Sequence, residues 1–192
     1  MGYPAIKYIT PQEYLELEIN SIEKHEYFNG EIVGMAGNTK NHNLIVANLI
    51  GEIHAFLKEK NCNVYPSDFR LATPSFDSFM YPDVTIVCGE TELKDTAFDT
   101  LTNQVVIIEV MSQSTENNDR GYKFFYYRQI PSIKEYILVD SMRCHAEIIR
   151  FGKDLKWEMI NINGLNEFIS INAIDMQLPM KNVYDRVIFE HR

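Results

Sequence analysis

The eight-residue run Gln104–Met111, QVVIIEVM, is the feature that most constrains the fold. Five of its eight residues are Val or Ile, so a strand built from it has no polar face to turn toward solvent. Such a strand is stable when other layers of the protein cover both of its faces. The run therefore predicts the central strand of a sheet flanked by helices, which places the chain in the α/β class.

The segments that follow this run complete a β-α-β unit. Ser112 to Thr115 provides hydroxyl groups that can cap a helix, and Pro131 stops that helix near Gln129. Lys134–Asp140 then has the composition of a strand. Because it follows a helical crossover, we expect it to run parallel to its predecessor.

The N-terminal part of the chain predicts a helix and then a hairpin. Thr10-Pro11-Gln12-Glu13 has the pattern of a capping box with proline at the first helical position, and the helix should continue to about Ile19. Asn29-Gly30 lies between the runs His25–Phe28 and Glu31–Val33. This dipeptide suits the positive φ angles of a two-residue type I′ turn, so the two runs should pair.

A long helix and a second strand pair are expected next. Apolar residues recur at helical spacing from Ile45 to Leu57, after a loop over 34–38. The runs Asn63–Ala72 and Tyr81–Cys88 then predict two strands that pair antiparallel, joined by the turn-rich segment 73–78.

The C-terminal tail has the pattern of a β-meander. Its three strand-like runs are Cys144–Phe151, Leu155–Ile162 and Glu167–Ile171, and a short helical segment near 183–185 should close it. At 192 residues the chain is expected to form a single domain over 1–192, with its core at about 40–140.

Charge and cysteine content exclude several classes of protein. The net charge of −9 argues against a general nucleic-acid-binding surface, although a local basic groove remains compatible with it. No stretch approaches the ~18 apolar residues that a membrane span needs. The three cysteines, Cys62, Cys88 and Cys144, are scattered without a CxxC pair, so we expect neither a disulfide framework nor a cysteine-zinc site. A reducing, cytoplasmic location is the resulting expectation.

Glu109 is the most informative residue for function. It interrupts an apolar strand, and a buried carboxylate is costly unless it is paired, protonated or bound to metal. Asp83 follows Pro82 near the start of the preceding strand, and adjacent strands lie only ~4.8 Å apart, so both carboxylates can reach one cation if these strands pair. Oxygen ligands of this kind suit Mg²⁺ or Mn²⁺. Taken singly, Pro82-Asp83 could instead be a plain turn, and Glu109 could reach solvent at the strand end.

The order of these motifs resembles the PD-(D/E)XK nuclease superfamily, and within it the Uma-two family of restriction-endonuclease-like proteins. The likeness spans about residues 10–140 and rests on Glu26, Asn29-Gly30-Glu31, His42, Pro82-Asp83, Glu109-Val110-Met111-Ser112, Asp119, Lys123 and Glu135–Asp140. It implies a restriction-endonuclease-like mixed central sheet flanked by helices, with an N-terminal hairpin and a C-terminal β-meander. It also implies that Asp83, Glu109 and the backbone carbonyl of Val110 bind Mg²⁺.

The chain departs from the superfamily pattern at Met111. The usual lysine lies two residues after the acid, and a thioether can neither neutralise a phosphate nor orient a hydroxide. The resemblance implies that Lys123, on the following helix, takes the place of this lysine. Asp119 lies four residues earlier on the same helix face and could steer the ammonium group, although a plain surface ion pair is the alternative.

The resemblance implies a metal-dependent endonuclease that hydrolyses phosphodiester bonds in DNA, with Asp83, Glu109 and Lys123 as catalytic residues. Because both strands of a duplex are most simply cut by two related sites, a homodimer is left open. One alternative is a binding or assembly module that keeps the nuclease fold without turnover, favoured by Met111 and the charge of −9. A second alternative is a small-molecule phosphodiesterase.

Four further residues have weaker claims on the site. His42 opens the first long helix and is either a site residue or an exposed residue near the helix cap. Arg70, Arg120 and Arg128 could flank a phosphate track, although a solvated charge is the default for each.

Overall fold

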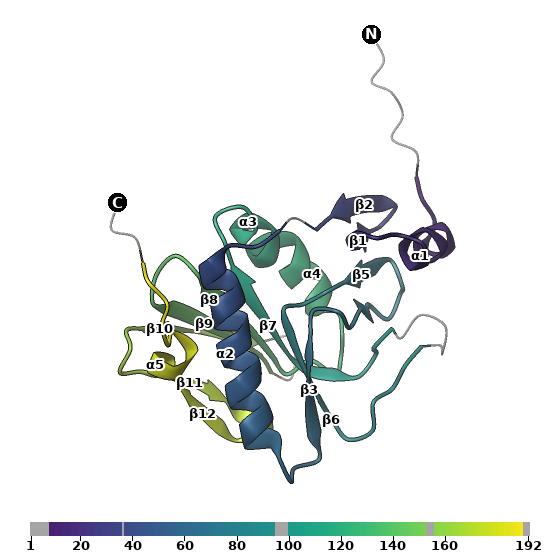
Figure 1. Ribbon diagram of the computed structural model, residues 1–192. Coiled ribbons are helices and arrows are strands. Elements are labelled where there is room, and N and C mark those ends of the chain that lie inside the picture. The colour runs from purple at the N-terminus through teal and green to yellow at the C-terminus, as the bar shows by residue number, and fades with distance from the viewer. Residues whose placement is uncertain (1–7, 36, 95–99, 153–155, 190–192) are drawn as a thin grey trace.

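A six-stranded mixed sheet forms the centre of the protein, in the strand order β10-β9-β8-β7-β6-β3. The computed structural model describes residues 8–35, 37–94, 100–152 and 156–189 (Figure 1). β7 pairs parallel with β8 and antiparallel with β6, so the strand expected to be central has that position. The strands are β3 (Cys62–Pro66), β6 (Val84–Cys88), β7 (Gln104–Met111), β8 (Glu135–Asp140), β9 (His145–Phe151) and β10 (Trp157–Asn163).

Helices cover both faces of this sheet, as the buried character of β7 predicts. Val106, Ile108 and Val110 pack into the core beneath α2 (Lys40–Leu57), which crosses in front of the sheet in Figure 1. Because side chains alternate along a strand, Ile107, Glu109 and Met111 point to the other face. That face packs against the second helical segment, which consists of α3 (Glu116–Asn118), a π-helical turn (Asp119–Lys123) and α4 (Phe124–Tyr127).

The N-terminal layer consists of α1 (Pro11–Ile19) and a four-stranded sheet in the order β2-β1-β5-β4. Thr10 and Glu13 form the expected capping box. β1 (His25–Phe28) and β2 (Glu31–Gly34) form the expected hairpin, with φ angles of 44° at Asn29 and 99° at Gly30. The layer lies at the upper right of Figure 1.

The first run of the predicted second strand pair divides between two sheets as β3 and β4, whereas the second run forms β6 alone. β3 and β6 pair antiparallel in the central sheet as expected, whereas β4 (Leu71–Ala72) and β5 (Ser78–Met80) pair in the N-terminal layer. The chain crosses from β5 to β6 through 81–83. Pro82 has no N–H to donate, so it cannot continue a ladder, and the strand expected over Tyr81–Cys88 begins only at Val84.

The C-terminal meander ends at β10. β11 (Phe168–Ile171) pairs with β12 (Met176–Pro179) instead of β10, and a 3₁₀ turn (Asn172–Ile174) and α5 (Met180–Val183) complete the unit. Its apolar side chains pack with those of α2 in one core. Burial against α2 therefore decides where β11 lies, which local periodicity cannot reveal.

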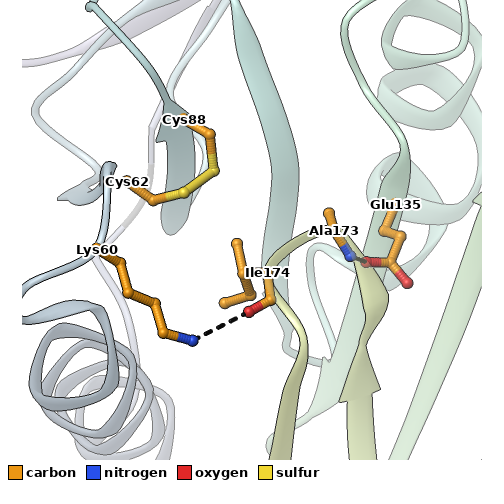
Figure 2. Close-up of a disulfide and its surroundings, with 6 residues drawn as sticks. All are labelled: Lys60, Cys62, Cys88, Glu135, Ala173 and Ile174. Atoms are coloured by element: carbon orange, nitrogen blue, oxygen red, sulfur yellow. Dashed lines mark hydrogen bonds between the residues drawn. A yellow bond between two sulfur atoms is a disulfide. The ribbon is translucent and has the colours of Figure 1, made fainter.

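A disulfide joins Cys62 and Cys88, contrary to the expectation of no disulfide framework (Figure 2). The β3–β6 register places these residues directly opposite one another at the ends of the two strands. They are 26 residues apart in sequence, so spacing alone could not predict their pairing. The argument from cysteine content for a reducing compartment therefore fails. Within the described residues, no helix has the length and apolar character needed to cross a membrane.

Candidate active site

The structure brings Asp83 and Glu109 together where β6 begins and β7 nears its end. The register pairs Val84 with Ile108, which sets Asp83 across from Glu109. The backbone N–H of Val110 donates to Asp83 Oδ2 at 2.8 Å, and the N–H of Asp83 donates to Glu109 Oε2 at 3.4 Å. Glu109 is only 2% exposed, so it does not reach solvent at the strand end.

Lys123 reaches this pair from the second helical segment. Its ammonium lies 3.1 Å from Glu109 Oε1, and the residue is 6% exposed, so the plain surface ion pair considered above does not describe it. The O–H of Tyr127 donates to the same Glu109 oxygen at 2.7 Å. Asp119 and Lys123 begin and end the π-helical turn, and both are buried. π-Helical turns are rare and are often found at functional sites.

Glu26 is a member of the cluster that the sequence reasoning missed as a site residue. Its Oε1 lies 2.9 Å from the Lys123 ammonium and accepts a hydrogen bond from the N–H of Tyr81 at 3.1 Å. A signal was present, because strand alternation puts Glu26 on the same face of β1 as Phe28, and both are buried. A carboxylate on a buried strand face needs a partner, as for Glu109.

His42 also contacts the site and is not an exposed residue near the helix cap. It lies in the first turn of α2, is 3% exposed, and its Nε2 is 3.1 Å from Asp83 Oδ2. Its Nδ1 is buried and has no hydrogen-bond partner within the described parts of the chain. The imidazole therefore fixes the orientation of the Asp83 carboxylate from the α2 side.

Three carboxylates, of Glu26, Glu109 and Asp119, lie within 3.7 Å of the Lys123 ammonium, and Asp83 is a fourth acidic group beside Glu109. Burial raises the pKa of Glu109 well above its usual range, and nearby Asp119 and Asp83 add to the effect although Lys123 opposes it. Burial likewise raises the pKa of Asp119. For Lys123, burial lowers the pKa, but Glu109, Glu26 and Asp119 outweigh it and raise the pKa well above its usual range. The acidic groups are crowded in a buried space, so an added cation would favour their ionised forms.

The donor set fits a hydrated Mg²⁺ or Mn²⁺ better than a metal enclosed by protein. Among the described residues, no three His, Cys, Asp or Glu side chains form a metal-binding group. Mg²⁺ commonly takes one or two carboxylates and fills its other positions with water and substrate phosphates. Asp83 and Glu109 could supply the carboxylates. The Val110 carbonyl points to the same side of its strand as the Val110 N–H, toward Asp83, because both groups of one residue do so in an extended strand.

Two of the three arginines considered for a phosphate track have structural roles. Arg70 is buried and donates to Thr100 Oγ1 and to the Tyr81 hydroxyl. Arg120 pairs with Glu116 and Glu147, which ties the π-helical turn to β9. Arg128 lies over the ring of Phe125, at 4.8 Å from its centroid.

An open cavity of about 770 Å³ lies between the start of α2 and the ends of β7 and β8. Thr39, Lys40, Ser112, Gln113 and Ser141 contribute polar groups to its lining. In α/β sheets, ligands commonly bind in the crevice outside the carboxyl ends of the strands. The cavity adjoins the end of β7, but Asp83, Glu109 and Lys123 are not among its lining residues.

Comparison with known proteins finds a matching family model and two similar chains. The family model Uma2, described as "Putative restriction endonuclease", matches residues 11–181. The chain is 30% identical over 181 residues to the uncharacterized protein slr1290 of Synechocystis sp., covering 94% of each chain. It is 32% identical over 172 residues to the uncharacterized protein sll1609 of the same organism, covering 90% of this chain and 97% of that one.

A solved structure has the same fold. It is the crystal structure of "a putative nuclease belonging to DUF820" from Anabaena variabilis, which matches with a TM-score of 0.78 over 94% of this chain and 99% of that chain. The two sequences are 14% identical, so the match describes the fold alone.

Proposed function

Because the chain belongs to the Uma2 family, we propose that it is a metal-dependent endonuclease that hydrolyses phosphodiester bonds in DNA. The observation that carries the proposal is the contact of the Lys123 ammonium with Glu109, beside Asp83. A lysine next to two acidic residues at a strand edge is the constellation that this chemistry needs, although here the lysine comes from a helix and Met111 occupies its usual place.

The acidic residues would hold the ion and the lysine would act on the phosphate. Asp83, Glu109 and the Val110 carbonyl would bind Mg²⁺ or Mn²⁺. When bound, such an ion lowers the pKa of a coordinated water and stabilises the charge of the phosphorane-like transition state. His42 and the Val110 N–H hold the Asp83 carboxylate in place before the substrate arrives.

Lys123 would serve as a positive charge and not as a general base. Its carboxylate neighbours raise its pKa well above the usual range, so the group stays an ammonium at neutral pH. A fixed ammonium can donate hydrogen bonds to the attacking water or to a phosphate oxygen as negative charge develops there.

The second candidate function is a nuclease-fold binding or assembly module without turnover. The low exposure of Glu109 and Lys123 favours it, because a substrate phosphate must reach these groups. The structural roles of Arg70 and Arg120 also leave fewer cations for a nucleic-acid track.

Cleavage assays with the full chain separate the two candidates. Single-stranded and double-stranded DNA and RNA would be incubated with Mg²⁺, Mn²⁺ or a chelator. We expect cleavage of DNA that requires metal and is lost in Asp83→Asn and Glu109→Gln. The matched control is Glu135→Gln, since Glu135 is equally buried but binds Arg150 and the backbone of 172–173. Wild-type protein that cleaves no nucleic acid with any metal would instead support the binding module.

A further inference from the structure

Glu26 connects the N-terminal layer to Lys123 and to the segment that carries Asp83. It lies on β1, is 4% exposed, and its Oε1 contacts the ammonium of Lys123 and the N–H of Tyr81. Tyr81 begins the 81–83 segment that carries Asp83. One oxygen atom of Glu26 therefore touches the lysine and the segment that supplies a proposed metal ligand.

Local sequence explains how Glu26 reaches this position. The Asn29-Gly30 turn fixes the β1–β2 register, which turns Glu26 and Phe28 to one face. β1 also pairs with β5, with Tyr27 opposite Phe79. The chain leaves β5 at Met80, so Tyr81 emerges next to Glu26 and its N–H can donate to the Glu26 carboxylate.

The distances favour Glu26 over Asp119 as the second anchor of the lysine. The Lys123 ammonium is 2.9 Å from Glu26 and 3.1 Å from Glu109, but 3.7 Å from Asp119. The first two distances are within hydrogen-bond range and the third is outside it. Asp119 still forms an ion pair with the ammonium, and Glu26 adds a closer anchor from a different sheet.

We infer that Glu26 is a positioning residue, which holds the Lys123 ammonium against Glu109 and holds the 81–83 segment beside it. Its effect on cleavage rests on the proposed nuclease function. Its effect on the lysine and on the segment does not. Glu26 acts through these groups and makes no contact with the reacting phosphate.

Two variants test the role of Glu26 in single-turnover DNA cleavage. Glu26→Ala removes both contacts, and we expect a loss of rate of about 100-fold, the scale of a small misplacement of a catalytic group. Glu26→Gln keeps an acceptor oxygen for Tyr81 and Lys123 but lacks the charge, so we expect a smaller loss, about tenfold. Both losses should fall on the rate at saturating DNA, with the half-saturating DNA concentration nearly unchanged.

Glu18→Gln is the matched control. Glu18 belongs to the same N-terminal layer, is buried, and accepts a hydrogen bond from the Tyr81 hydroxyl, but it does not contact Lys123. We expect it to cleave at close to the wild-type rate. If Glu18→Gln loses as much rate as Glu26→Gln, loosening of the layer explains the effect and the positioning role is overturned.

A spectroscopic measurement tests the role of Glu26 independently of nuclease activity. In ¹⁵N-lysine-labelled protein, the Lys123 ammonium signal, assigned by its absence in Lys123→Met, should be protected from solvent exchange. We expect Glu26→Gln to shift this signal and speed its exchange, whereas Glu18→Gln leaves both unchanged. An unaltered Lys123 signal in Glu26→Gln would overturn the inference. If the wild type cleaves no nucleic acid, the proposed function fails and this measurement still decides the role of Glu26.

Discussion

The carboxylates of Asp83 and Glu109 are each held by a backbone N–H at or next to the other residue. The N–H of Asp83 donates to the Glu109 carboxylate, and the N–H of Val110, the residue after Glu109, donates to the Asp83 carboxylate. These two hydrogen bonds hold the acidic groups together at one end of the β6–β7 pair before any cation binds. It also confines each carboxylate to a narrow range of positions, as a preorganised metal site requires.

Removal of either acidic charge should weaken metal binding without loss of the fold. Asp83→Asn and Glu109→Gln nearly conserve volume, so we expect each to lower Mn²⁺ affinity by at least about tenfold, the lower end of what even outer-shell changes cost. Isothermal titration calorimetry measures this, with circular dichroism as the check on folding. Wild-type Mn²⁺ affinity in both variants would rule out the two-carboxylate site.

Lys123 should be required for cleavage and not for metal binding. Lys123→Ala deletes the charge, so we expect cleavage to be lost while Mn²⁺ binding is largely retained. It also leaves Glu26 and Glu109 buried without their cation, so stability should fall by about 3–5 kcal/mol in denaturant titrations. Full cleavage by Lys123→Ala would exclude the lysine from the mechanism.

A lysine at position 111 should restore part of this activity. Met111 points to the same face of β7 as Glu109, two residues away, where the superfamily pattern has its lysine. We therefore expect Lys123→Ala/Met111→Lys to cleave faster than Lys123→Ala in single-turnover assays. Equal rates would mean that an ammonium on β7 cannot replace the one on the helix.

The Arg120–Glu147 pair should make the π-helical turn sensitive to acid. Burial raises the pKa of Glu147, but hydrogen bonds from Arg120 and His145 outweigh it and lower the pKa below the usual 4.5. A carboxylate with a lowered folded-state pKa contributes its full stabilisation above the unfolded-state pKa, and this contribution is lost as pH falls through the folded-state pKa. The free energy of unfolding of the wild type should therefore exceed that of Glu147→Gln by about 1–3 kcal/mol at pH 7.

Urea titrations of both proteins across the acid range measure this difference. We expect the gap between wild type and Glu147→Gln to shrink as pH falls below 4.5. Because other carboxylates titrate equally in both proteins, the gap isolates Glu147. A gap that stays constant down to the acid limit would contradict the pKa assignment.

The Cys62–Cys88 disulfide should stabilise the fold under oxidising conditions. It closes a 26-residue separation, and the chain-entropy model assigns ~3.5 kcal/mol to a loop of this size. We expect reductant to lower the urea midpoint of the wild type and to leave Cys62→Ala/Cys88→Ala unchanged. Alkylation of unreduced, unfolded protein should label Cys144 alone. Labelling of all three cysteines would show that the bridge does not form.

Much of the local structure followed from short stretches of sequence. The buried β7 strand, the capping box at Thr10 and the Asn29-Gly30 hairpin were all predicted correctly. Each depends on residues within a few positions of one another, through side-chain alternation, a helix-terminal hydrogen bond or a turn that needs positive φ. Glu109 stood out for the same reason, as a charge in an apolar strand.

The tertiary structure alone decided which distant segments meet. The sequence indicated that Glu109 needs a partner if it is buried, but not that Glu26 shares its lysine from another sheet. It could not reveal the cross-strand pairing of Cys62 with Cys88 or the departure of β11 from the meander. The physical reason is that register and packing between remote segments depend on how the whole core is filled, whereas periodicity and turn chemistry are properties of neighbouring residues.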